Sequence, residues 1–144
     1  MTSQRHQRGV AIVEFALVLP LLLLLTFITT EFGRALYQYN TLAKAVRDGA
    51  RYLSVQTPGT GISQARNLIV YGSVAGGTTP QLPNLSAALV PDPVWATAGA
   101  LPVINTVTVR VSGYQFQWMF TTAFGHSFGP LTFPDITATL RSHL

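Results

Sequence analysis

Apolar residues are concentrated near the start of the chain. Residues 10–30 contain one charged side chain, Glu14, and include the five consecutive leucines from Leu21 to Leu25. A helix built from such a run has no polar face, unlike a surface helix of a globular protein. At about 1.5 Å per residue it would be about 31 Å long, which matches the hydrocarbon core of a bilayer. The pattern predicts a transmembrane helix over residues 10–30.

Beyond this span, apolar residues recur at alternating spacings of three and four, as they do along one face of a helix. The pattern predicts a single helix from Val10 to about Ser54, ended by the Pro- and Gly-containing residues 57–61. Gly49 lies on the apolar stripe, and its small size predicts a close approach by another element. The stripe can pack on the chain's own C-terminal domain or on neighbouring subunits. Its members are Phe32, Ala35, Tyr39, Leu42, Val46, Gly49 and Leu53.

Two segments in the C-terminal part alternate apolar and polar residues, as strands with one buried face do. One covers residues 105–111, where three valines point the same way. The other runs through Ile136, Ala138 and Leu140, and the Pro-Asp pair before it predicts a bulge or a strand start. Both segments are long enough for neighbouring strands of one small antiparallel sheet.

The region before these strands has weaker signals. Residues 63–71 predict a short helix, although part of this segment also fits a strand. Residues 72–102 are rich in Gly, Pro, Thr, Ala and Ser, and they predict loops with one strand near residues 87–90. The expected fold class is α+β: a long N-terminal helix, membrane-spanning in its first half, that packs in its second half on a small antiparallel β-sheet domain.

Aromatic residues gather between the two predicted strands. They have two interpretations, packing within the core or forming a surface for subunit or membrane contact. The set is Tyr114, Phe116, Trp118, Phe120, Phe124 and Phe128.

Charge is scarce and unevenly placed. Charged residues make up 10% of the chain against about 25% in an ordinary soluble domain, while apolar residues reach 48%. This composition excludes a disordered chain and argues against a fully soluble protein. Nine Lys and Arg against five Asp and Glu give a formal charge of +4. Arg5 and Arg8 precede the apolar span, so the positive-inside rule predicts a cytoplasmic N-terminus and an exported C-terminal part. The charges at Arg34, Lys44 and Arg47 beyond the span weaken this asymmetry.

Glu14 is costly within an apolar span, and an acid in a membrane segment is a functional candidate by default. Gly9 lies five positions before it, between a short basic leader and the apolar helix. Cleavage after Gly9 would leave a positive α-amine on Val10, which Glu14 of a neighbouring subunit could neutralise. Pro20 removes one helix hydrogen bond and predicts a kink. That kink is either incidental or a flexible point for filament entry.

These residues resemble a known family. Gly9 followed by Glu14 and Phe15 at the mouth of an apolar helix is similar to the cleavage signature of type IV prepilin peptidases. More narrowly, the run RGVAIVEFALVLP at residues 8–20 resembles the TadE-like proteins, minor pseudopilins of the Flp or tight-adherence pilus system. Residues 31–37 and 45–52 are similar to the same family. The resemblance implies cleavage between Gly9 and Val10 by a membrane prepilin peptidase, followed by a role in pilus assembly.

The sequence thus predicts four segments and a structural role. We expect a cytoplasmic leader at 1–9, a transmembrane segment at 10–30, an exported helix continuation at 31–56 and an exported α+β domain at 57–144. The resemblance implies as partners the bacterial inner membrane, a prepilin peptidase, other pilins and the assembly machinery. We expect no enzyme activity, cofactor, metal, nucleic acid or small-molecule substrate. His126, Ser127 and Asp135 lack the motif of a nucleophile site. The alternative is an unprocessed, single-pass membrane anchor that carries a periplasmic binding module.

Overall fold

The protein is described by a computed structural model that covers residues 4–120, 122–123 and 126–143, with the side chains of 4–8, 123 and 126 outside the description. The chain divides into two compact units, one up to Leu36 and one from Tyr37 onward. Helix α1 (Gln4–Ser54) supplies the first unit and begins the second. Its end at Ser54 confirms the predicted end, whereas its helical start lies before the expected Val10.

The first unit consists of α1 up to Leu36, and its apolar side chains face outward. Val10 and Leu17 are 68% and 76% exposed, and the leucines from Leu21 to Leu25 are at least partly exposed. Threonine hydroxyls in this region donate to backbone carbonyls one turn earlier, for example Thr26 Oγ1 to Leu22 O at 2.8 Å. Such bonds satisfy hydroxyl groups that no water would reach inside a bilayer. Among the described helices, α1 is the one long and apolar enough to cross a membrane.

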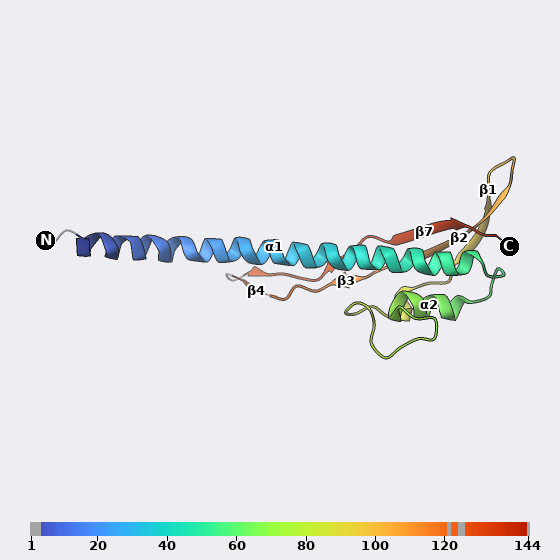
Figure 1. Ribbon diagram of the computed structural model, residues 1–144, viewed down its shortest axis with the longest axis horizontal. Helices are drawn as coiled ribbons and strands as arrows, with labels where there is room; N and C mark the ends of the chain where they lie inside the picture. Colours follow the sequence, from blue (N-terminus) through green and yellow to red (C-terminus); the bar gives the residue numbers. More distant parts are fainter. Residues whose placement is uncertain (1–3, 121, 124–125, 144) are drawn as a thin grey trace. The chain divides into compact units, whose positions relative to one another are not determined.

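The second unit combines the rest of α1 with a second helix and a small sheet (Figure 1). Helix α2 spans Ile62–Tyr71, and the 3-10 helix η1 spans Ala87–Leu89. The main sheet is antiparallel with strand order β1-β2-β7. Two short strand pairs, β3–β6 and β4–β5, complete the unit. The strands are β1 (Val94–Ala98), β2 (Ile104–Val111), β3 (Gln115–Phe116), β4 (Thr122–Ala123), β5 (His126–Ser127), β6 (Leu131–Thr132) and β7 (Ile136–Arg141).

Both strands predicted from alternation are present and paired. In β2, the side chains of Val107, Val109 and Val111 are at most 2% exposed, which confirms the predicted buried face. Strand β7 pairs with β2 so that Ala138 lies opposite Val109. It begins at Ile136, directly after the Pro-Asp pair, so that pair marks a strand start. Together with the second half of α1, the sheet confirms the α+β fold class.

The core of the second unit lies along the apolar stripe of α1. Leu42, Val46 and Leu53 are almost completely buried. A Cβ atom built on Gly49 would lie 2.7 Å from both Cγ1 and Cδ1 of Ile69 in α2, so the predicted close approach is confirmed. For this part of α1, the stripe therefore packs on the chain's own domain.

The structure corrects one prediction for the residues before the sheet and decides another between a helix and a strand. The strand expected near residues 87–90 is wrong, because this segment is η1, held by a Val90 N–H to Ala87 O bond of 3.1 Å. The edge strand is instead β1, where Trp95 lies opposite Val107 of β2. Alanines favour strands weakly, and a valine–tryptophan segment beside a valine-rich strand gains more from cross-strand packing. Residues 63–71 are helical, and the N-cap of α2 is Gly61 in a left-handed conformation (φ 73°).

The aromatic set divides between core and surface. Tyr114 and Phe116 are buried and pack with Phe133, whose ring is parallel to that of Phe116 at 6.3 Å. Phe120 and Phe128 are each 46% exposed. Phe124 lies outside the described residues. The core interpretation therefore holds for Tyr114 and Phe116. Trp118 is half-buried, with its ring against Phe116 and Phe128, and an exposed surface remains for Phe120 and Phe128.

Candidate functional site: the N-terminal face of helix α1

The predicted site residues lie near the beginning of α1. Gly9, Val10 and Glu14 line one shallow hollow of about 450 Å³, together with Val13 and Leu17. These positions share a helix face because residues three and four apart are neighbours on a helix. Within one chain, the structure therefore places Gly9, Val10 and Glu14 around one hollow, whereas the proposed pairing of Val10 with Glu14 joins two subunits and stays a prediction.

The other predicted residues lie outside this hollow. Phe15 is 59% exposed and adjacent to Glu14 in the chain. Pro20 lies inside α1, which is helical on both sides of it. Arg5 and Arg8 belong to α1 by their backbone, and their side chains are outside the description. The kink at Pro20 and the orienting role of the two arginines stay predictions.

Gly9 makes the predicted cleavage position both open and weakly helical. A Cβ atom at Gly9 would meet no atom within 4 Å, so nothing described covers this peptide group. Glycine costs a helix interior about 1 kcal/mol relative to alanine. Local unwinding of α1, which would expose the Gly9–Val10 bond to a peptidase, is therefore easier here than at the neighbouring residues.

Glu14 is exposed on an otherwise apolar face. Among the residues whose side chains are described, none forms an ion pair or hydrogen bond with it. A carboxylate in such surroundings gains from any positive group that a second molecule brings, because pairing offsets the cost of removing each charge from water.

Sequence reasoning missed one charge pair at the other end of the apolar run. Arg34 Nη1 donates to Glu31 Oε1 at 2.6 Å. The signal was available, since an acid followed three residues later by a base on a helix is a favourable spacing. The pair lowers the cost of placing both charges directly after the long apolar run of α1.

These features define the class of the protein. It has an N-terminal helix that is long and apolar enough for membrane anchoring, followed by an α+β unit. The described residues contain no cluster of three or more His, Asp or Glu side chains that could hold a metal ion. The site thus consists of a helix face, with one acid and one glycine among aliphatic side chains.

Comparison with known proteins then narrows the class. Residues 9–51 match the model of the family described as TadE-like protein, which confirms the resemblance over this segment. No curated protein and no solved structure matches the chain. The family match and the membrane-span-like helix together fit a protein related to the Tad pilus system.

Proposed function

We propose that this protein is a structural, pilin-like subunit, a TadE-like minor pseudopilin that takes part in assembling a Flp/Tad type IV pilus. It is inserted in the bacterial inner membrane by residues 10–30, with the N-terminus in the cytoplasm and the α+β domain in the periplasm. A prepilin peptidase removes residues 1–9 by cutting after Gly9. The processed subunit then joins other pilins and the assembly machinery, and it reaches the cell surface with the pilus.

One observation carries this proposal: the family match begins at Gly9 and covers the apolar helix together with its acid. The geometry supports it, since a Cβ atom at Gly9 would meet no atom within 4 Å and Glu14 lines the same shallow hollow as Gly9. The exposed apolar surface of the first unit supports storage in a bilayer and later packing against other helices.

The mechanism rests on a charge pair formed between subunits. Cleavage leaves Val10 as the first residue, with a positive α-amine at neutral pH. In a packed bundle, Glu14 of one subunit accepts hydrogen bonds from the Val10 amine of its neighbour. Removing either charge from water alone is costly, so adjacent helices take the axial offset at which the Val10 amine and the Glu14 carboxylate meet.

Intact-mass measurement tests the cleavage step. The full chain is expressed with an active prepilin peptidase, and a parallel culture carries an inactive one. We expect loss of residues 1–9 in the first culture alone, and expect Gly9→Val to retain them because a branched side chain blocks the cleavage position. A leader that stays attached beside an active peptidase would favour the alternative, an unprocessed membrane-anchored binding module.

A structural role is also proposed in place of enzyme activity. His126 and Asp135, the weak catalytic candidates, lie on β5 and immediately before β7. The pocket that holds Glu14 is lined otherwise by glycine and aliphatic side chains, which offer no general base partner or oxyanion donor. The proposed function therefore needs no cofactor, metal, nucleic acid or small-molecule substrate.

A further inference from the structure

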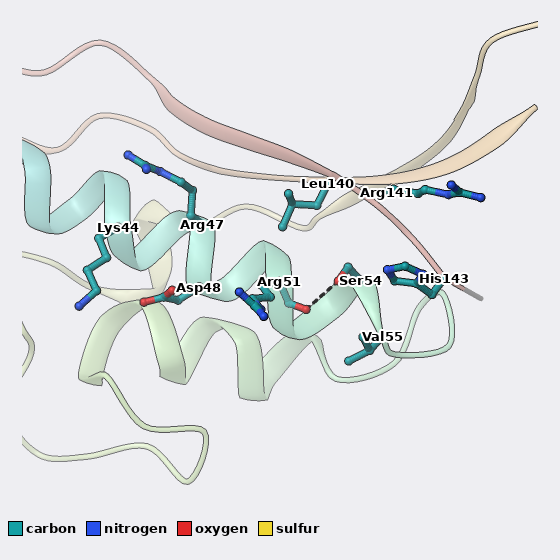
Figure 2. Close-up of a pocket in the computed structure, with 9 residues that line it drawn as sticks. All are labelled: Lys44, Arg47, Asp48, Arg51, Ser54, Val55, Leu140, Arg141 and His143. Carbon is teal, nitrogen blue, oxygen red and sulfur yellow. Dashed lines mark hydrogen bonds between the residues drawn. The ribbon is translucent and has the colours of Figure 1, made fainter.

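A basic groove lies in the second unit, at the C-terminal end of α1. It has a volume of about 630 Å³, a size typical of ligand sites. Figure 2 shows that its side chains come from two parts of the chain, the last turns of α1 and the segment at and after the end of β7. We define the basic groove by its lining residues, Lys44, Arg47, Asp48, Arg51, Ser54, Val55, Leu140, Arg141 and His143.

Most Lys and Arg residues of the second unit that form no ion pair with a described residue line the groove. Of the six Lys and Arg from Tyr37 onward, Arg66 is bound to Asp92 at 2.8 Å. Four of the other five line the groove, and Arg110 on β2 is the fifth. Among the described residues, no ion pair joins these four to any acid. With Asp48 as its single acid, the groove carries a formal charge of +3 when His143 is neutral.

Positive charge exceeds negative charge along this part of α1. Arg47 and Arg51 are four residues apart, a spacing at which like charges repel, while Asp48 lies four residues after Lys44 and three before Arg51 and offsets part of that repulsion. The net charge of the groove stays positive, so the groove attracts an anionic partner.

One backbone hydrogen bond joins the two sides of the groove, and a second joins the segment after β7 to β2. The His143 N–H donates to Ser54 O at 2.9 Å, and the Ser142 N–H donates to Asn105 O at 2.8 Å. The Ser54 hydroxyl donates to Arg51 O at 2.8 Å (Figure 2). The backbone around the groove is thus fixed before any partner arrives, which reduces the ordering cost of binding.

We propose that the basic groove docks an acidic segment of a partner protein, one in which carboxylates alternate with aliphatic side chains. The positive side chains fit the carboxylates, with the arginines able to bind them in bidentate fashion. Val55 and Leu140 line the same groove and fit the aliphatic side chains. This mixed lining favours a peptide over a free inorganic anion. A lipid headgroup is the competing ligand that the test below separates from the peptide.

Fluorescence anisotropy tests the proposal with the full chain in an uncharged detergent. The probe is a labelled octapeptide of alternating glutamate and leucine. We expect saturable binding that weakens about tenfold when salt rises from about 50 to 200 mM, because the contacts are charge-charge contacts. A matched peptide of alternating lysine and leucine should not bind.

Variants separate the groove from general basicity. Arg47→Gln and Arg51→Gln should each weaken binding about fivefold, whereas Arg110→Gln, which removes a positive charge outside the groove, should leave it unchanged. Asp48→Asn should tighten binding about threefold, since it removes the one acid that repels the peptide. A damaged fold could explain weaker binding by the arginine variants, but it could not explain tighter binding by Asp48→Asn.

Three results would overturn the proposal. One is equal loss of binding in Arg110→Gln and Arg51→Gln, which would indicate general basicity. Another is no change in Asp48→Asn. The third is displacement of the peptide by a water-soluble phosphatidylglycerol at a lower concentration than by unlabelled peptide, which would assign the groove to lipid. The measurement uses the chain with its leader attached, so its outcome is independent of the cleavage proposed above.

Discussion

Gly49→Ala tests the closest approach in the second unit. The substitution places a methyl group in the contact between α1 and α2. A Cβ atom there would lie 2.7 Å from Cγ1 and Cδ1 of Ile69, far inside van der Waals distance. Ile69 is fully buried, so its side chain has little room to move away.

Two effects of opposite sign decide the outcome. Alanine improves the intrinsic helix propensity of α1 by about 1 kcal/mol relative to glycine. Overpacking a closed core costs about 1–3 kcal/mol, and a contact with two atoms of one buried side chain belongs in the middle of that range. We therefore expect Gly49→Ala to lower the free energy of unfolding by about 1 kcal/mol. For a folded part of this size, that corresponds to a fall in Tm of about 4 °C.

Thermal unfolding of the full chain in detergent, followed by near-ultraviolet circular dichroism, measures this change. Gly33→Ala is the matched control on the same helix, because a Cβ atom there meets nothing within 4 Å. The double variant Gly49→Ala/Ile69→Ala should lose less stability than the two single losses combined, since the added methyl group enters the space that Ile69 leaves. A Gly49→Ala protein at least as stable as Gly33→Ala would refute the close-packing argument.

Two further predictions concern a buried tyrosine and the membrane acid. The Tyr114 hydroxyl lies 2.9 Å from both Gln38 Oε1 and Pro83 O and has one hydrogen to donate to them, so Tyr114→Phe should cost about 1–3 kcal/mol in chemical denaturation by leaving a buried acceptor unpaired. Burial also raises the pKa of Tyr114 above its ordinary value of 10.0. The contribution of the neutral Tyr114 hydroxyl to the free energy of unfolding should therefore be complete below pH 10.0 and fall as the pH rises further. An equal loss of stability at alkaline pH in Tyr114→Phe would contradict this. For Glu14, we expect Glu14→Ala to leave membrane insertion intact and to reduce incorporation into pili, because the Val10 amine loses its partner. Unchanged incorporation, measured by immunoblot of sheared pili with Glu14→Asp as the comparison, would remove the charge pair from the mechanism.

Local patterns were enough to predict the long helix α1 and the two longer strands, while they left the segment of α2 open between a helix and a strand. The apolar run at 10–30, the stop after Ser54 and the alternation of β2 and β7 each depend on residues close in sequence. The same holds for the candidate site, since Val10 and Glu14, four residues apart, share a helix face through helix geometry alone. Periodicity and composition determine such features before any tertiary contact forms.

Tertiary structure decided the features that join distant residues. The edge strand is β1 and not residues 87–90, because β1 pairs with β2 and gains cross-strand contacts there, whereas residues 87–89 form η1. Tyr114 forms a hydrogen bond with Gln38 on α1, and Arg141 lines the same groove as Arg47. No local pattern marks these partners, since their energy appears only when the chain closes a long loop and buries both sides. The sequence by itself therefore determined the long apolar helix and its acid, while folding alone assembled the core contacts and the basic groove.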